Sequence, residues 1–176
     1  MRIAAAAIDV VAKWGVEGLT HRRVAAAARV PLGSMTYHFS SLDDLLLVAS
    51  ELAAERNREA WRQWRMGLPP QPDLAAELTR LLIEVFSTKE RSRSIVQIEL
   101  YLAAMRRPAL RKISVAWGRV VFETLTELTD ATTAHALSLM LDSLAAEALV
   151  AGEPPARAEC LRMFSRVMPP AERRNA

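Results

Sequence analysis

The chain has 176 residues, of which 51% are apolar and 24% charged, and its formal net charge is +3. This length and composition exclude a disordered chain and predict a protein with a real core. No run of eighteen apolar residues is present, so no membrane span is expected. The single cysteine, Cys160, excludes an internal disulfide and fits a reducing cytoplasm, and we expect it to be a small buried apolar residue.

Helix-favouring residues dominate the chain, and apolar residues recur three and four positions apart between breaks at glycine and proline. The first helix is amphipathic and does not resemble a signal peptide. A charged loop or first turn at 89–93 precedes a sixth helix that ends near residue 105. The pattern predicts an all-α fold of about nine helices, the others lying near 2–14, 20–28, 32–38, 42–66, 73–87, 109–129, 132–151 and 155–168.

The stretch Val30–Phe39 contains ten residues and no acid. A short helix beginning near Leu32 would turn Met35 and Phe39 inward, because residues three and four apart share a helix face. Its other face would carry hydroxyl, phenol and imidazole groups, which are good donors to phosphate oxygens and base edges. Preceded by a helix that Thr20 can cap, the stretch indicates a helix-turn-helix.

The charge around this motif is uneven. Between residues 18 and 40 the chain has three arginines, two histidines and no acid. A local basic patch of this kind is what phosphates require, although a solvated helix face with a chance bias is the alternative. Ser41 with Asp44 forms a capping-box pattern, which predicts the start of a long fourth helix.

Several spaced elements match in order the DNA-binding domain of TetR-family transcriptional regulators. They are Gly15–Thr20, Val24–Ala28, Val30–Phe39 and the pair Leu45-Leu46, so the resemblance covers residues 1 to about 46. The family's turn glycine is Arg29 here, where a left-handed backbone costs roughly 1 kcal/mol and a reshaped turn is one expectation. The lysine that usually reaches a phosphate at the start of the fourth helix is Leu42.

The resemblance and the residues together predict a helix-turn-helix domain at 1–46 and a helical ligand-binding and dimerisation domain at 47–176. We expect Ser34, Thr36 and Tyr37 to contact base edges or adjoining phosphates. The residues expected to bind DNA are Thr20, Arg22, Arg23, Arg29, Leu32, Gly33, Ser34, Thr36, Tyr37 and His38.

The last two predicted helices have more than one apolar face, whereas a surface helix needs one stripe. Burial against both the chain's own core and a second copy explains this pattern, and a deep core helix is the alternative. The resemblance also implies a homodimer through these helices, which would bind a palindromic double-stranded DNA operator. The expected interface residues are Leu137, Met140, Leu141, Leu144, Ala148, Leu161 and Phe164.

Helices four to seven carry an aromatic set that is either core or part of a pocket. The resemblance implies a pocket for an unknown small-molecule inducer there, and such pockets are apolar with few polar groups. Glu99 lies in an otherwise apolar helix, where it either binds a polar ligand group or pairs with an arginine such as Arg106 or Arg111. The expected ligand-binding residues are Trp61, Phe86, Glu99, Tyr101 and Trp117.

Catalytic and cofactor motifs are missing from the sequence. Its three histidines lack metal-ligand spacing, and neither a phosphate loop nor a nucleophile elbow occurs. We therefore expect no enzyme, no metal and no cofactor. The predicted function is a ligand-released repressor; an activator or inducer-independent regulator is the first alternative, and a helical enzyme or structural bundle is a remote one.

Overall fold

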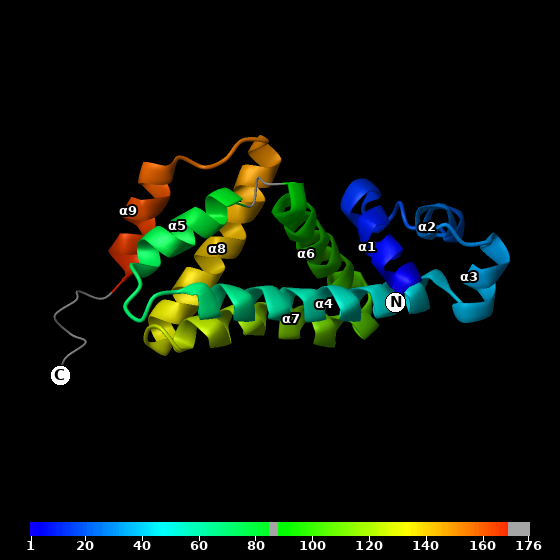
Figure 1. Cartoon of the computed structure of the whole chain (residues 1–176), viewed down its shortest axis with the longest axis horizontal. Helices are drawn as coiled ribbons and strands as arrows, with labels where there is room; N and C mark the ends of the chain where they lie inside the picture. Colours follow the sequence, from blue (N-terminus) through cyan, green and yellow to red (C-terminus); the bar gives the residue numbers. More distant parts are fainter. Residues whose placement is uncertain (85–87, 169–176) are drawn as a thin grey trace. The chain divides into compact units, whose positions relative to one another are not determined.

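The computed structural model describes residues 1–84 and 88–168, without the side chains of Thr36, Thr88 and Lys89. The described residues form nine α-helices and no strand, which confirms the predicted all-α class. Figure 1 labels these helices in chain order. They are α1 (Arg2–Trp14), α2 (His21–Ala28), α3 (Leu32–His38), α4 (Leu42–Gly67), α5 (Leu74–Glu84), α6 (Thr88–Arg106), α7 (Pro108–Thr126), α8 (Ala131–Ala151) and α9 (Arg157–Val167).

Most helix starts follow the local signals in the sequence. Ser41 Oγ accepts a hydrogen bond from the Asp44 N–H (3.0 Å), as the capping-box pattern predicts, and Asp73 Oδ1 accepts one from the Ala76 N–H (3.0 Å) at the start of α5. Residues 89–93, predicted as a loop or first turn, belong to the first turns of α6. Asp130, which the sequence analysis did not single out, caps α8 by accepting from the N–H groups of Thr132 and Thr133.

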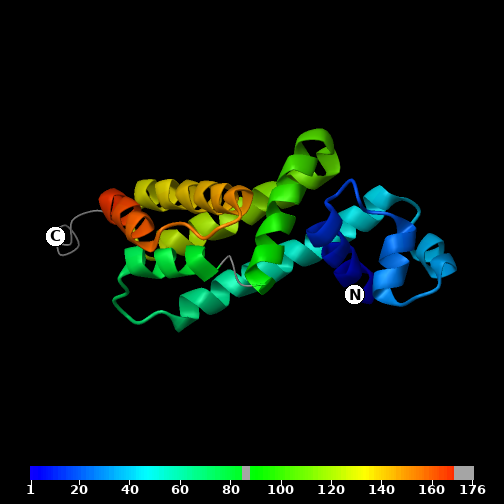
Figure 2. The same ribbon diagram turned by 90° about the horizontal axis from the view of Figure 1, so that it is seen from above.

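The chain divides into two compact units. Unit 1 comprises residues 1–60 and 92–117, and unit 2 comprises residues 61–91 and 118–176. In unit 1, α1 contacts α2 and α2 contacts α3, and Figure 2 shows these three short helices from above. Their core includes Leu100 and Trp117 from α6 and α7, so the N-terminal helices do not have a core of their own.

The turns of unit 1 depend on two glycines and one strained arginine. Gly15 has φ 69° and ψ 174°, a region that is essentially restricted to glycine. A Cβ on Gly18 would lie 2.3 Å from the Trp14 carbonyl oxygen, so this close approach also requires glycine. Arg29 keeps the left-handed conformation (φ 53°, ψ 50°), so the turn is not reshaped by the absence of glycine.

Trp14, the last residue of α1, does not face the core. Its side chain is 54% exposed, and its ring lies 5.1 Å from Lys13 Nζ and 5.2 Å from the Arg23 guanidinium. Two cations over the ring stabilise it at the surface through its negative π face. The apolar spacing of α1 therefore ends at Val11, which is 1% exposed.

Unit 2 is built on α5, α8 and α9, and all three pairs of these helices are in contact. Its core contains Trp61, Leu78, Leu137 and Phe164, and the buried Cys160 lies in the same cluster, as expected. Burial raises the pKa of the Cys160 thiol, which disfavours the reactive thiolate. By length and hydropathy alone, α8 is also a candidate membrane span. In the fold, 28% of its most apolar 18-residue window is buried.

Candidate nucleic-acid interface

Helix α3 is short, and the buried side chain of Met35 anchors it. Met35 is fully buried against the core of unit 1, beside Val24, Ala25 and Ala28 of α2. Thr20 caps α2, because its Oγ1 accepts a hydrogen bond from the Arg23 N–H (3.2 Å). With Met35 fixed inward, the opposite face of α3 is held outward.

The outer face of α3 carries the polar groups that the sequence predicted. Tyr37 is 85% exposed, and its ring meets the exposed His38 edge to face at 5.1 Å. Leu32 is 51% exposed, and a Cβ added to Gly33 would meet nothing within 4 Å. The Thr36 side chain lies outside the described part of the structure. An exposed tyrosine on a seven-residue helix has no role in the core, so it is available to a partner.

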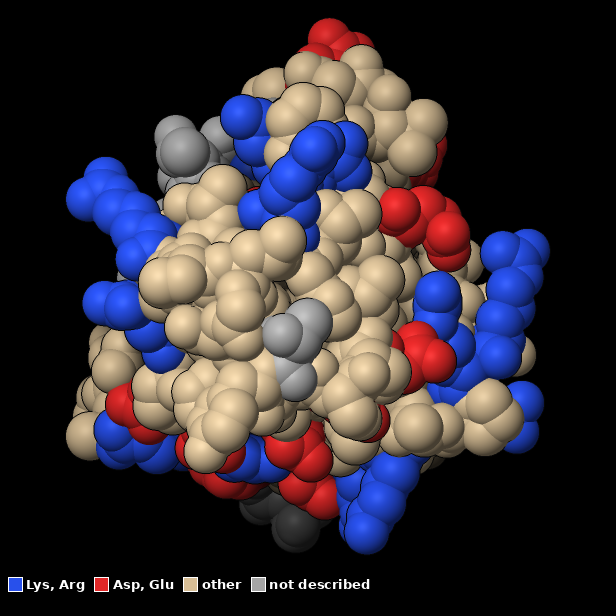
Figure 3. All heavy atoms as spheres, turned by 90° about the vertical axis from the view of Figure 1, so that its right-hand side faces the viewer, with Lys and Arg blue, Asp and Glu red and all other residues tan. Residues whose placement is uncertain are grey.

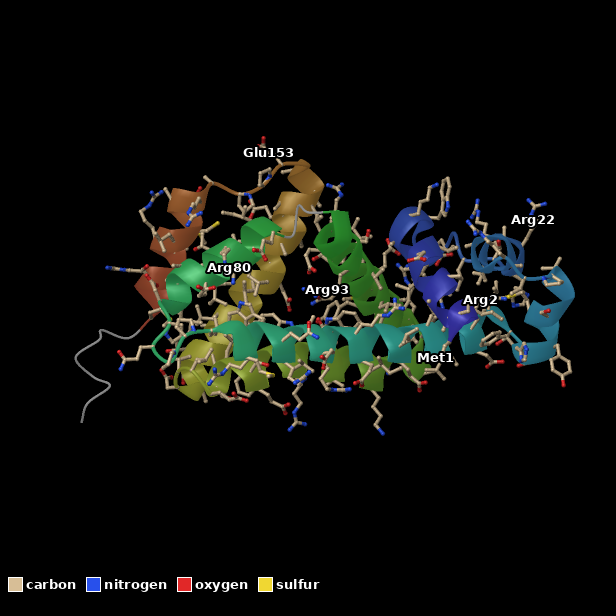
Figure 4. The ribbon with its side chains drawn as sticks, in the orientation of Figure 1. Met1, Arg2, Arg22, Arg80, Arg93 and Glu153 are labelled. Carbon is tan, nitrogen blue, oxygen red and sulfur yellow. The ribbon has the colours of Figure 1, made fainter. Side chains whose placement is uncertain are left out.

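The structure separates the three arginines of the basic patch. Arg23 Nη1 donates to the Gly18 carbonyl oxygen (2.7 Å) while its guanidinium covers the Trp14 ring, so it holds the turn between α1 and α2. Arg22 is exposed and extends away from α2 in Figure 4. Within the described residues, the guanidinium groups of Arg22 and Arg29 form no hydrogen bond or ion pair.

Figure 3 looks onto the end of the molecule that carries α2 and α3. The middle of this face is largely uncharged, and lysine and arginine side chains lie around its margin. Several carboxylates are also visible near the right and lower edges.

A depression of about 460 Å³ adjoins the same face of unit 1. Ser34 and His38 of α3 line it, together with Met1 and Arg2 at the start of α1, which Figure 4 labels. Arg2 lies 32 residues before Ser34 in the sequence, and no local pattern connects the two residues. The depression adds a further cation to the surface around α3.

The expected ligand-binding residues differ in exposure and belong to different units of the structure. Trp61 belongs to the core of unit 2, where its ring packs edge to face on Trp64 at 5.2 Å. Trp117 is 4% exposed in the core of unit 1, whereas Tyr101 is 59% exposed. Phe86 lies outside the described residues. The buried indole N–H groups of Trp64 and Trp117 have no partner within the described residues.

Glu99 has a partner that neither sequence hypothesis anticipated. Its Oε2 accepts a hydrogen bond from the backbone N–H of Val16 (2.8 Å), in the turn between α1 and α2. Arg107, at the end of α6, lies 3.3 Å from Asp43 Oδ1 at the start of α4. The pairing of Glu99 is therefore with a backbone amide rather than with Arg106 or Arg111, and it fixes α6 to the N-terminal helices.

The residues expected at a dimer interface divide into two groups. Leu137, Leu141, Ala148 and Phe164 are buried within unit 2 itself, at 0 to 6% exposure. Met140 and Leu144 are half-buried, and Leu161 is 37% exposed. The apolar side chains that unit 2 leaves at the surface of α8 and α9 are Leu139, Val150, Leu161 and Met163.

No group of three or more His, Cys, Asp or Glu side chains within 1–84 and 88–168 is arranged to hold a metal ion. The histidines instead make separate contacts. His135 packs edge to face on Phe122 at 5.9 Å in unit 2, and His38 contacts Tyr37 in unit 1.

Comparison with known proteins agrees with this arrangement. A family model described as "Tetracyclin repressor-like, C-terminal domain" matches residues 69–170. The chain is also similar to HTH-type transcriptional regulator CymR of Pseudomonas putida, with 31% identity over 111 residues. That alignment covers 63% of this chain and 53% of CymR, so the chain matches about half the length of this relative.

Solved structures extend the similarity over nearly the whole chain. Multidrug binding protein EbrR complexed with imidazole is 42% identical, with a TM-score of 0.79, over 98% of this chain and 96% of EbrR. EbrR complexed with ethidium gives 40% identity and a TM-score of 0.79, covering 96% and 98% of the two chains. A TetR-family member from Streptomyces coelicolor A3 is 40% identical, with a TM-score of 0.79, over 96% and 97%.

Proposed function

Since the chain belongs to the TetR family of transcriptional regulators, we propose that it is a dimeric repressor that a small molecule releases from its operator. The outer face of α3 is the observation that carries the DNA-binding part of this proposal. Tyr37 is 85% exposed there and meets His38 edge to face, while the buried Met35 fixes the helix orientation. A rigid face of this kind is suited to the major groove.

Individual groups have different roles in the proposed complex. Ser34, Thr36 and Tyr37 meet base edges or adjoining phosphates, while Arg22 and His38 hold phosphates and position the helix. Thr20 contributes as well, because the hydroxyl that accepts from the Arg23 N–H retains its own O–H donor. Arg23 acts mainly on the turn, since the Gly18 carbonyl and the Trp14 ring already engage its guanidinium.

The second copy is proposed to cover the apolar side chains left exposed on α8 and α9. Leu139 is 57% exposed and Leu161 is 37% exposed, and both lie on helices with a buried opposite face. Two recognition helices in one dimer require a palindromic operator whose half-sites are about one helical turn apart, or a multiple of it. A cytoplasmic location is part of the same proposal.

The ligand is proposed to be a flat aromatic compound. The similarity to EbrR, which has been solved with ethidium, supports this class. Within unit 2, the largely buried Trp61 packs edge to face on Trp64, and the buried Trp64 N–H lacks a partner among the described residues. Trp61, from the expected ligand-binding set, and its neighbour Trp64 are the first side chains to test, because aromatic side chains interact favourably with flat aromatic and cationic ring systems.

A salt-dependent gel shift on the upstream region of the gene tests the DNA-binding part first. We expect dimer binding that weakens steeply with salt, because phosphate contacts release counterions. Ethidium is then titrated with operator and with an equal concentration of unrelated duplex, because ethidium itself intercalates into any DNA. Linkage requires that operator weaken ethidium binding to the protein, beyond the effect of the unrelated duplex, by the factor by which ethidium weakens operator binding. If the affinity of the protein for ethidium is the same with operator as with unrelated duplex, ethidium is not an inducer. A reporter assay separates a repressor from an activator.

A further inference from the structure

Arg29 adopts a backbone conformation that an arginine rarely takes. With φ 53° it is the one positive-φ residue other than glycine in the described part of the chain. It ends α2 in a Schellman arrangement, in which the Arg29 N–H donates to the Ala26 carbonyl and the Val30 N–H donates to the Ala25 carbonyl. This turn needs a left-handed residue, which glycine or asparagine supplies with less strain.

The Arg29 side chain makes no specific contact within the described fold. The residue is exposed, and within the described residues its guanidinium forms no hydrogen bond or ion pair. Strained residues persist where the surroundings or a function require them. In the folded chain its charge interacts only with the C-terminal end of the α2 dipole, which any cation would do, so a partner outside the chain is a physical reason for an exposed guanidinium at this strained position.

The surroundings of Arg29 indicate what that requirement is. The turn leads directly into the exposed Leu32 at the start of α3, and the sequence from 18 to 40 contains no carboxylate. Arg22, the other unpaired arginine of this stretch, extends from α2 toward solvent. A guanidinium has five fixed N–H donors that match the geometry of a phosphate group.

We propose that Arg29 is a DNA-backbone anchor, and that its strained conformation is tolerated because its guanidinium binds a phosphate when α3 enters the major groove. This inference rests on the proposed DNA-binding function. A phosphate contact carries no sequence information, so Arg29 contributes equally to operator and to unrelated duplex DNA. The same residue then lowers the stability of the free chain, through its strained backbone, and raises the affinity for DNA, through its charge.

Three variants of the full chain separate backbone strain from charge. Arg29→Gly removes both, Arg29→Asn keeps a side chain that tolerates the left-handed region but removes the charge, and Arg29→Lys keeps the charge. Arg22→Gln is the matched control, because it removes an equally exposed charge from regular helix. Melting temperature and DNA affinity at several salt concentrations are measured for each.

We expect Arg29→Gly to raise the melting temperature by about 2–4 °C. It should lower affinity for operator and unrelated DNA alike, about five-fold per protomer near 0.15 M salt, and reduce the salt slope by about 0.9 per protomer. Arg29→Asn should lose the same affinity without melting earlier, and Arg29→Lys should retain most of the slope. Arg22→Gln should lose affinity without gaining stability.

Two results would overturn the inference. In the first, Arg29→Gly binds DNA as tightly as the wild type with the same salt slope. In the second, Arg29→Lys loses as much affinity and slope as Arg29→Asn, which would assign the effect to the backbone of the turn. A wild-type chain that binds no DNA would instead refute the proposed function, so the two failures are distinguishable.

Discussion

Glu99 of α6 accepts a hydrogen bond from the backbone N–H of Val16, and the two residues are 83 positions apart in the sequence. The same carboxylate lies 3.1 Å from where a Cβ on Gly15 would be, so the turn between α1 and α2 is shaped around it. Val16 is 6% exposed, which leaves its N–H dependent on this partner. The contact links α6 to the helices that present the candidate DNA-binding face.

Removing the Glu99 carboxylate should therefore destabilise unit 1. We expect Glu99→Ala to lower the free energy of unfolding by about 1–3 kcal/mol, since it leaves a buried N–H without an acceptor. Glu99→Gln keeps a carbonyl acceptor and should lose less. Denaturant unfolding measures both. Equal stability of the wild type and Glu99→Ala would show that the hydrogen bond contributes nothing.

Gly33→Ala tests whether the start of α3 approaches DNA closely. Because a Cβ there meets nothing within 4 Å in the free chain, alanine should stabilise the helix by about 0.5–1 kcal/mol. The added methyl group should lower DNA affinity roughly ten-fold, about 1.4 kcal/mol, if the backbone lies against the duplex. Melting curves and gel shifts give the two values. Unchanged affinity would place Gly33 away from the DNA.

Arg22 and Arg23 should respond differently to alanine substitution. Arg22→Ala should weaken binding to all DNA sequences and reduce the salt slope by about 0.9 per protomer, with an unchanged melting temperature. Arg23→Ala should lower the free energy of unfolding by about 1–2 kcal/mol, because it removes the hydrogen bond to Gly18 and the contact with Trp14. Identical behaviour of the two variants would contradict their separate roles.

The proposed dimer surface can be tested without disturbing the core. Leu139→Glu and Leu161→Glu place a charge on exposed positions, so each should give a folded monomer by sedimentation and circular dichroism. Leu141→Glu, at 6% exposure, buries a charge in unit 2 and should unfold the chain at a cost of several kcal/mol. If both surface variants remain folded dimers, the dimer interface does not include Leu139 or Leu161.

Asp130 should make stability depend on pH. The hydrogen bond from the Thr133 hydroxyl, followed by backbone N–H groups, lowers the pKa of Asp130 below its ordinary 3.8. A lowered pKa in the folded state means that stability is present above pH 3.8 and is lost as pH falls through the folded value. Asp130→Asn keeps a good N-cap residue without titrating. The melting temperature of Asp130→Asn should approach that of the wild type as the pH falls below 3.8. A difference between the two melting temperatures that stays constant over this pH range would contradict the linkage.

Sequence alone determined the features that depend on neighbours within one or two helical turns. The caps at Ser41 and Asp73, the short helix after Pro31 and the inward Met35 all follow from residues one to four positions apart. Such patterns are readable because helical geometry repeats every 3.6 residues. The acid-free run around α3 was visible in the same way, since charge bias needs no knowledge of the fold.

Tertiary structure decided which of several equally patterned residues serve the fold and which remain available. Nothing local distinguishes Arg23 from Arg22, yet only Arg23 reaches the Gly18 carbonyl and the Trp14 ring. Likewise, Leu141 is buried and Leu139 exposed on one apolar helix, depending on which face α5 and α9 cover. These outcomes depend on contacts between distant segments, whose partners are set by packing of the whole core rather than by spacing along the chain.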